Sequence, residues 1–286
     1  MALHGQREDS FTKVRNADHD GAFHVVDGVR SSYQASDPHL VVWFLGGSTT
    51  FGIGQRDEHT IPSEVGRLAE ADGHPIRVEN LGVSAWSTWQ EVIELQRRLD
   101  TEPAPDLVVF LDGVNDYSLF CELVDQGRDT RWPAIIGDTD AYPGPRTADH
   151  KPRGTPARYQ ELTRYARALN RSWEGASALL TARGIQALRY WQPIVATLQN
   201  DATDDAIYKR LGYWPDTVGP ERREYRTLGE LLEPRPLDIT DAMDALPKAP
   251  YFDWAHTNEQ GAKAVARAMY ADLGDLLASL DQPGSG

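Results

Sequence analysis

A serine that follows two glycines is the first residue in this sequence with the features of a nucleophile. Ser48 comes directly after Gly46 and Gly47, which close the apolar run LVVWFL at residues 40–45. A serine in this place can simply cap the next helix. The glycines, however, permit a sharp turn that exposes the hydroxyl, and the following helix would direct its first amides at the same point. Ser48 is therefore a candidate nucleophile as well as a candidate cap.

Other glycine-rich motifs do not fit this stretch. The segment GGSTTFGIG has no Gly-Lys-Ser/Thr for a phosphate-binding loop, and Asp57 stands where a dinucleotide motif starting at Gly52 needs its third glycine. Thr50 occupies the last position of G-x-S-x-G, so that form of the nucleophile turn is absent as well. With these motifs excluded, the segment is best described as a serine that follows a glycine turn.

A histidine near the C-terminus has the spacing of a general base. His256 follows Asp253 by three residues, just before the last expected helix. In a turn of this length the carboxylate reaches imidazole Nδ1 and leaves Nε2 free to face a serine. We predict that Asp253 orients His256 and that His256 activates Ser48.

Two further groups follow expected strands. Gly82 ends the stretch IRVENLG, and Asn115 follows the stretch PDLVVFLDG. Each can be an ordinary turn or cap residue. In an open parallel sheet, however, ligands bind at the carboxyl ends of the strands, so both residues are expected beside Ser48. We predict that the backbone amides of Ser48 and Gly82 and the side-chain NH₂ of Asn115 form an oxyanion hole.

The elements that must position these residues follow from the apolar pattern. Near-continuous apolar runs predict buried parallel strands, and the segments between them predict helices on both faces of the sheet. Thr88 with Glu91, and Thr257 with Gln260, have the spacing of helix capping boxes. The expected strands are 40–45, 76–82, 105–113, 185–193 and 237–243, and the expected helices are 61–73, 87–100, 159–184 and 258–280.

One α/β domain over residues 39–280 accounts for this alternation. Residues 1–38 are expected to be an N-terminal extension, and residues 281–286 a tail. Two long polar excursions, at about 121–155 and 200–236, interrupt the rhythm, and such long loops often serve as lids. Aromatic residues in them are candidates for a lid over the site: Trp132, Tyr142, Tyr213 and Trp214.

Composition limits the classes of partner. Acidic residues outnumber basic ones by 43 to 29, giving a net charge of −14. This balance disfavours nucleic acids and anionic membranes, which require clustered Lys and Arg. Cys121 is the only cysteine, which excludes an intrachain disulfide and a Cys-rich zinc site. The N-terminal residues have no apolar signal region and no run is long enough to span a membrane, so we expect a cytoplasmic protein.

The motifs together resemble those of the SGNH hydrolases, or GDSL-type esterases and lipases. The resemblance covers roughly residues 38–275 and is carried by FLGGSTTFG, VENLGVSAWST, VVFLDGVND and DWAHTNEQGAKAVA. It implies a three-layer α/β/α sandwich with a five-stranded parallel sheet of the flavodoxin-like type. It also implies ester hydrolysis without a metal or cofactor, by Ser48, His256 and Asp253, with Gly82 and Asn115 in the oxyanion hole. The first block departs from Gly-Asp-Ser-Leu, but the serine and its glycine turn remain.

Three functions follow as alternatives. The first is a serine esterase for a small or medium acyl ester, such as an ester of a secondary metabolite or an acylated sugar. The second is an acyltransferase that uses the same three residues, and the third is a noncatalytic binding module on this fold. For the esterase, aromatic residues near the motifs are candidates to line the substrate pocket, although tryptophans also pack cores: Trp86, Trp89 and Trp254.

Overall fold

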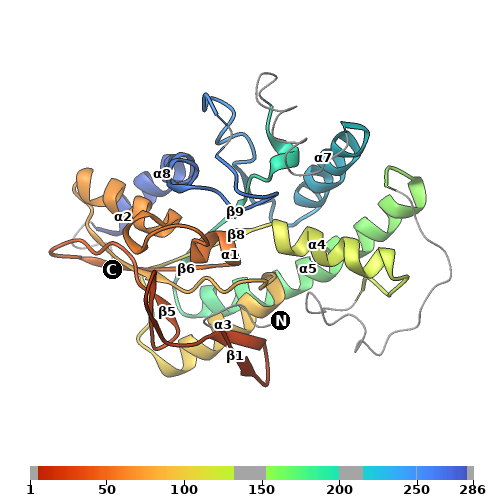
Figure 1. The fold of residues 1–286 in the computed structure, drawn as a ribbon. Helices are drawn as coiled ribbons and strands as arrows, with labels where there is room; N and C mark the ends of the chain where they lie inside the picture. The colour runs from red at the N-terminus through yellow and green to blue at the C-terminus, as the bar shows by residue number, and fades with distance from the viewer. Residues whose placement is uncertain (1–5, 132–152, 200–214, 249, 282–286) are drawn as a thin grey trace.

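The computed structural model describes residues 6–131, 153–199, 215–248 and 250–281, and its centre is a parallel sheet (Figure 1). The five parallel strands lie in the order β10, β9, β8, β6 and β7. Numbered along the chain, this is the flavodoxin-like order 2-1-3-4-5, as expected. The strands are β6 (Leu40–Gly46), β7 (Ile76–Asn80), β8 (Leu107–Asp112), β9 (Gln186–Trp191) and β10 (Leu237–Asp238).

Helices cover both faces of this sheet, which confirms the three-layer α/β/α architecture. On one face α2 (Ile61–Ala71) packs against α8 (Glu259–Leu280), and on the other α3 (Thr88–Thr101) packs against α5 (Pro156–Ala182) (Figure 1). Two more helices, α4 (Val114–Asp125) and α7 (Pro215–Glu230), extend the α/β body at the end where the strands finish. In the described ranges, no helix has the length and apolarity needed to span a membrane.

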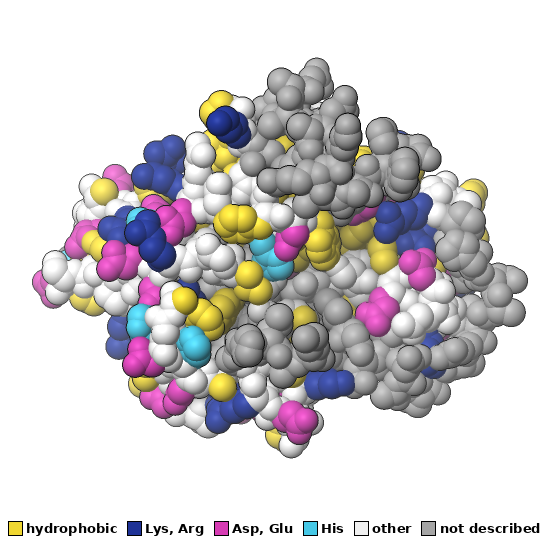
Figure 2. All heavy atoms as spheres, viewed as in Figure 1, with side chains coloured by type: hydrophobic (Ala, Val, Ile, Leu, Met, Phe, Trp, Pro, Cys, Tyr) yellow, Lys and Arg dark blue, Asp and Glu magenta, His cyan; other side chains and the backbone are white. Residues whose placement is uncertain are grey.

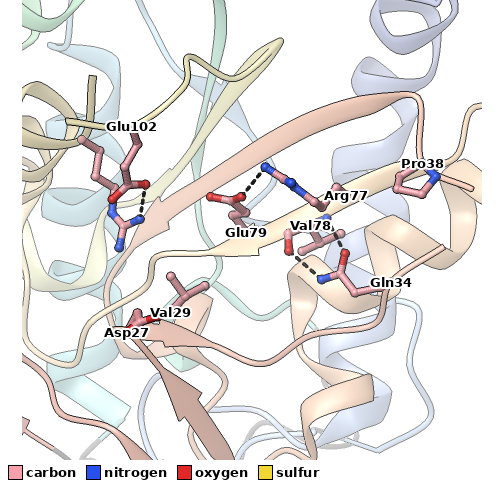
Figure 3. A pocket seen from close by; sticks show the side chains of 9 residues that line it. Asp27, Val29, Gln34, Pro38, Arg77, Val78, Glu79 and Glu102 are labelled. Atoms are coloured by element: carbon pink, nitrogen blue, oxygen red, sulfur yellow. Dashed lines mark hydrogen bonds and ion pairs between the residues drawn. The ribbon is translucent and has the colours of Figure 1, made fainter. Parts of the chain in front are cut away.

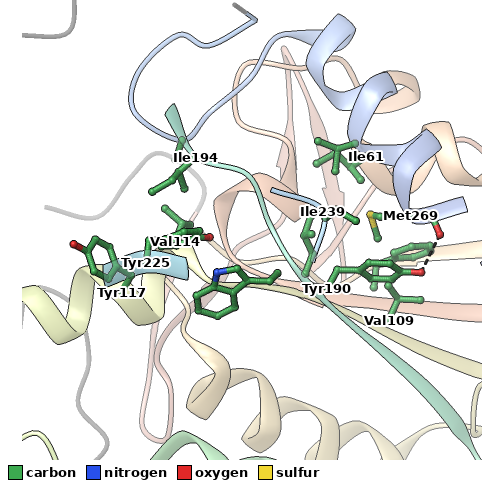
Figure 4. Close-up of a cluster of buried hydrophobic side chains, with 14 of the residues drawn as sticks. Ile61, Val109, Val114, Tyr117, Tyr190, Ile194, Tyr225, Ile239 and Met269 are labelled. Atoms are coloured by element: carbon green, nitrogen blue, oxygen red, sulfur yellow. Dashed lines mark hydrogen bonds between the residues drawn. The ribbon is translucent and has the colours of Figure 1, made fainter. Parts of the chain in front are cut away.

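Alternate residues of the central strands divide the core into two layers. Val42 and Val109 point into a cluster with residues of α2, α4, α7 and α8 (Figure 4), whereas Trp43 and Phe110 point into a second cluster with α3 and α5. This is the two-residue period of a strand that is buried on both faces. In the first layer Tyr190 Oη donates to the Met269 carbonyl at 2.9 Å, which joins the sheet to α8.

The N-terminal extension is more ordered than its sequence predicted. Strands β1 (Gln6–Asp9) and β2 (Lys13–Asn16) form a hairpin, and β3 (His19–Asp20), β4 (His24–Val26) and β5 (Val29–Arg30) join the main sheet antiparallel. The sheet therefore has eight strands in the described residues, and β5 covers the edge of β7 through the Arg30–Asn80 pair. Strands this short carry too few residues to show an alternating apolar pattern.

The structure gives other bounds for the fifth strand and shows helices inside the two expected excursions. The fifth strand is only Leu237–Asp238, because turns follow it. The 121–155 excursion begins within α4, and residues 215–230 of the 200–236 excursion form α7, whose buried residues include Tyr225 and Leu228. Residues 132–152 and 200–214 lie outside the described residues, and so do the proposed lid residues Trp132, Tyr142, Tyr213 and Trp214.

The helix caps also differ from the expected pairs. At α3 the cap is Ser87, whose N–H donates to Gln90 Oε1 at 3.1 Å, and at α8 it is Asn258, whose side chain accepts from Gly261 N. Thr88 and Thr257, the expected caps, are both buried and bonded elsewhere. In both cases a residue next to the expected cap also has a side chain that can cap a helix, so the spacing predicted the wrong residue of the two.

Burial predicts different costs for two similar substitutions in the sheet. Val109 in β8 is 0% exposed, and Val26 in β4 is 63% exposed. We expect Val109→Ala to lower the free energy of unfolding by about 2 kcal/mol, because it removes buried methyl groups and leaves a cavity. Val26→Ala should change it by less than about 0.5 kcal/mol. Urea unfolding of both variants checks this, and equal costs would contradict the observed packing.

Candidate functional site

Ser48 lies on a sharp turn between β6 and the short helix α1 (Ser48–Phe51). Gly46 has a φ of +156°, and a Cβ there would lie 2.1 Å from Thr50 Oγ1. A Cβ on Gly47 would lie 2.1 Å from Asn115 Nδ2. Both glycines are therefore required, the first by the turn and the second by the close approach of Asn115.

His256 and Asp253 come from the loop that leads into α8, and they meet Ser48 from the far end of the sequence. His256 Nε2 lies 2.7 Å from Ser48 Oγ, and His256 Nδ1 lies 2.7 Å from Asp253 Oδ2. The loop is closed by its own backbone, with Phe252 N donating to the His256 carbonyl at 2.8 Å. The structure thus brings together the three residues that the sequence placed in one hydrogen-bonded chain.

The second oxygen of Asp253 is fixed by backbone donors. Asp253 Oδ1 accepts from the N–H groups of Ala255 at 2.9 Å and His256 at 2.8 Å. Burial alone would raise the pKa of Asp253, but these hydrogen bonds and the one with the His256 side chain hold its pKa below the usual value. The carboxylate stays ionised and can stabilise a positive charge on the imidazole.

The loop after β7 lies beside Ser48, but its donors differ from the expected arrangement. The Gly82 N–H donates to Asn80 Oδ1 at 3.0 Å, so this predicted oxyanion donor is already engaged within the protein. Gly82 instead permits close packing, because a Cβ there would lie 2.3 Å from Phe51 N. Three residues later, Ala85 has a φ of +68°. No described residue accepts a hydrogen bond from its N–H.

Asn115 stands in the first turn of α4, directly after β8. Its Nδ2 donates to the Trp86 carbonyl at 2.6 Å, which ties α4 to the loop that contains Ala85. A side-chain amide has two N–H groups, so one remains for another acceptor. Because Asn115 Nδ2 also borders Gly47, the second N–H lies close to the serine turn.

The sequence does not reveal Ala85 as a donor, because no sequence pattern marks an alanine whose backbone lies in the left-handed region. Glycine or asparagine is the usual residue there, and Gly82 was the nearer glycine. The signal in the sequence is Asn80. Its short side chain can accept a hydrogen bond from an amide two residues later, as it does from Gly82, so the Gly82 amide is engaged and the donor must be another residue of the loop.

The three tryptophans named from the sequence have different environments. Trp86 is 1% exposed, and its Nε1 donates to the Val14 carbonyl at 2.8 Å, so it packs under the N-terminal hairpin. Trp254 is partly buried against the main core, and its carbonyl accepts from Val195 N at 2.9 Å. Trp89 is also half-buried.

A buried network of charged side chains supports the floor of the site. Arg189 Nε donates to Asp112 Oδ2 at 2.8 Å, and Arg189 Nη2 donates to Thr88 Oγ1 at 3.1 Å. Thr88 donates to both oxygens of Asp116, through Oγ1 at 2.8 Å and N at 3.2 Å. Asp116 follows Asn115 directly, so the network fixes the start of α4 against the start of α3.

Carboxylates exceed cations in this network. Burial, together with the nearby Asp112 carboxylate, raises the pKa of Asp116 to about 7, against the opposing effects of Arg189 and Thr88. Burial and Asp112 also raise the pKa of Glu91 well above its usual value. A proton is therefore retained among these acids at pH values where exposed carboxyls have lost theirs.

The structure also contains a large pocket of about 630 Å³ away from Ser48 (Figure 3). It lies between the N-terminal segment, β7 and the C-terminal end of α3. Its two arginines are paired: Arg77 with Glu79 at 2.9 Å and Arg98 with Glu102 at 2.7 Å. Because none of the residues around Ser48 line it, it is separate from the candidate site.

No protein-family model and no curated protein matches this sequence. Several solved structures resemble it over most of its length. A family 3 carbohydrate esterase from Clostridium thermocellum is 14% identical, has a TM-score of 0.48, and covers 85% of this chain and 99% of its own. A variant of Axe2, an acetyl-xylooligosaccharide esterase from Geobacillus stearothermophilus, is 17% identical, has a TM-score of 0.47, and covers 83% and 95%.

Another similar structure is AlinE4, described as an SGNH-hydrolase family esterase. It is 16% identical, has a TM-score of 0.44, and covers 85% of this chain and 99% of its own. The function of this chain must therefore be argued from its own side chains.

The raised pKa of Asp116 predicts a pH dependence of stability. Because the folded state binds a proton that the unfolded state releases near pH 4, the free energy of unfolding should fall as the pH rises from about 4 to about 7. We expect Asp116→Asn to reduce this slope, by up to about 1.4 kcal/mol per pH unit for one proton. Urea unfolding between pH 5 and 8 measures it.

The control is Asp275→Asn, which removes an exposed carboxylate of α8 and should keep the wild-type slope. An unchanged slope in Asp116→Asn would mean that this carboxyl is already ionised in the folded protein throughout that range.

Proposed function

We propose that this protein is a serine esterase that hydrolyses carboxylic esters with a small or medium acyl group. The observation that carries the proposal is the unbroken hydrogen-bonded chain from Ser48 through His256 to Asp253, with both side-chain contacts at 2.7 Å. A hydroxyl, an imidazole and an ionised carboxylate in this order are the parts needed for acyl transfer through a covalent intermediate.

In the first half of the proposed reaction, Ser48 Oγ attacks the ester carbonyl and His256 Nε2 takes the hydroxyl proton. Asp253 stabilises the imidazolium through Nδ1. When the tetrahedral intermediate collapses, the bond to the alcohol oxygen breaks and His256 returns the proton to that oxygen. The products are the free alcohol and an acyl group on Ser48.

The negative charge of the intermediate requires donors, and three groups are proposed for this role. They are the N–H of Ser48, which opens α1 and has no helical acceptor before it, the N–H of Ala85, and the second N–H of Asn115 Nδ2. Ala85 replaces Gly82 in this proposal, because the Gly82 amide is bonded to Asn80.

In the second half, water takes the place of the alcohol. His256 removes a proton from water as the oxygen attacks the acyl carbon, and then protonates Ser48 Oγ as the acid departs. An added alcohol can attack the same acyl-enzyme, which would make the protein an acyltransferase. Product analysis of nitrophenyl ester reactions with and without added alcohols separates the two activities, and we expect the free acid to predominate.

An activated serine predicts selective labelling by a fluorophosphonate. Intact mass should show one adduct on the wild type, mapped to Ser48, because the reagent needs a nucleophile with an adjacent base. Ser48→Ala and His256→Ala should lose the adduct and the hydrolysis of nitrophenyl esters. The matched control is Ser279→Ala, an exposed serine on α8, which should label as the wild type does. A folded wild-type protein without an adduct would contradict the proposal.

The donor assignment predicts how two variants differ. Asn115→Ala should lower kcat by roughly 10²-fold with little change in KM, because the contact strengthens in the transition state. Ala85→Gly retains the backbone N–H and suits a φ of +68°, so it should keep the wild-type kcat. Steady-state kinetics on one ester checks both. A KM effect alone in Asn115→Ala would assign that residue to ground-state binding.

A further inference from the structure

We propose that a pocket between the N-terminal strands and α1 binds the alcohol part of the ester and selects for an uncharged alcohol of medium size. This inference rests on the proposed esterase function. The pocket has a volume of about 510 Å³, which is within the range of small-molecule sites. The N-terminal strands provide one wall, with Ala22 and Phe23, and the segment from Phe51 to Arg56 provides the opposite wall.

The N-terminal wall is held firmly by hydrogen bonds to the body of the protein. Gln6 Nε2 donates to the Ser84 carbonyl at 3.0 Å, and Asn16 Nδ2 donates to the Gly82 carbonyl at 3.0 Å. Gln90 Nε2 donates to the Thr12 carbonyl at 2.7 Å from the start of α3. The first two bonds reach the loop that contains Ala85 and the third reaches α3, so the pocket is formed before a ligand arrives.

Aromatic rings and a buried arginine shape the interior. Phe23 and Phe51 meet edge to face, with ring centroids 5.5 Å apart, and the Arg30 guanidinium lies 5.0 and 5.1 Å from their centroids. Arg30 is 1% exposed and forms an ion pair with Asp57. Its charge is therefore balanced within the protein, and the rings remain as an apolar surface.

The charges of the lining residues favour a neutral ligand. Arg56 is the charged residue among them, and it is bonded to Glu259 through Nε and Nη2, each at 2.7 Å. The rest of the lining combines apolar rings with amide and hydroxyl groups, such as Gln55 and Ser84. Such a surface suits an alcohol that has an apolar face and few polar groups.

The position of the pocket assigns it to the alcohol and not to the acyl group. Phe51, which lines the pocket, follows Ser48 by three residues in α1, so the pocket lies next to the nucleophile, although Ser48 itself does not line it. Its far wall lies against both ends of the loop that contains His256. A Cβ on Gly54 would meet the Phe252 ring at 2.7 Å, and Gln55 Nε2 donates to the Thr257 carbonyl at 2.9 Å. His256 protonates the departing alcohol oxygen, so that oxygen must lie on this side.

In Figure 2, hydrophobic side chains gather near the middle of the face shown, beside a histidine and an acidic side chain. Apolar patches of this kind on the surface are typical of binding sites.

The test compares ethyl and phenethyl esters of the same acid, with the acyl group that the wild type hydrolyses fastest. Ala22→Trp fills the pocket from an exposed position, and Phe23→Ala removes an aromatic surface. Both should lower the ratio of kcat/KM for phenethyl over ethyl ester by about tenfold, mainly by raising the KM for the phenethyl ester. Phe11→Ala is the matched control, since Phe11 is 74% exposed at the turn of the neighbouring β1–β2 hairpin and lies outside the pocket.

Each outcome has a defined meaning. A ratio that stays at the wild-type value in both pocket variants would overturn the pocket assignment, and so would a change in preference among acyl chains in place of alcohols. A wild type that neither hydrolyses these esters nor reacts with a fluorophosphonate would overturn the esterase function itself. Fluorophosphonate labelling of Ser48 in every variant shows that the triad is intact, so loss of selectivity is distinguished from loss of folding.

Discussion

The close approach of three backbone segments is the constraint on which the candidate site depends. The turn after β6, the loop after β7 and the start of α4 meet where a side chain at Gly46, Gly47 or Gly82 would overlap another group. Hydrogen bonds that Asn80 and Asn115 donate to backbone carbonyls then fix the distances between the three segments. Small residues bring the segments together, and amide side chains hold them there.

Buried charged groups beneath the site reinforce this arrangement, but they lower the stability of the folded protein. Arg189, Thr88 and Asp116 link β9, α3 and α4 directly beneath the site, and every member of the network is buried. Buried carboxylates without an equal number of cations destabilise the folded protein unless a proton is retained. The network therefore fixes the geometry at the ends of the strands and lowers the free energy of unfolding.

The sequence allowed most of the architecture and part of the site to be predicted. Long apolar strands and the His-Asp spacing are local patterns, so β6, β8 and the pairing of His256 with Asp253 could be expected before the structure. What could not be predicted depends on contacts between distant segments. The strands β3 to β5 owe their formation to the free edge of β7, and the Gly82 amide is occupied because Asn80 turns toward it. The helix α7 was hidden by its polar composition and by Pro220, although packing buries one of its faces.

The antiparallel strand β5 has a consequence for the order in which the chain folds. Its partner in the sheet is β7, and β7 is itself placed by β6. Residues of β5 are synthesised before either strand, so they can pair with β7 only after Asn80 has been made. Contacts between such distant segments form late because the intervening chain must first be ordered. Strand β5 is therefore among the last strands to join the sheet, although it precedes its partner in the sequence.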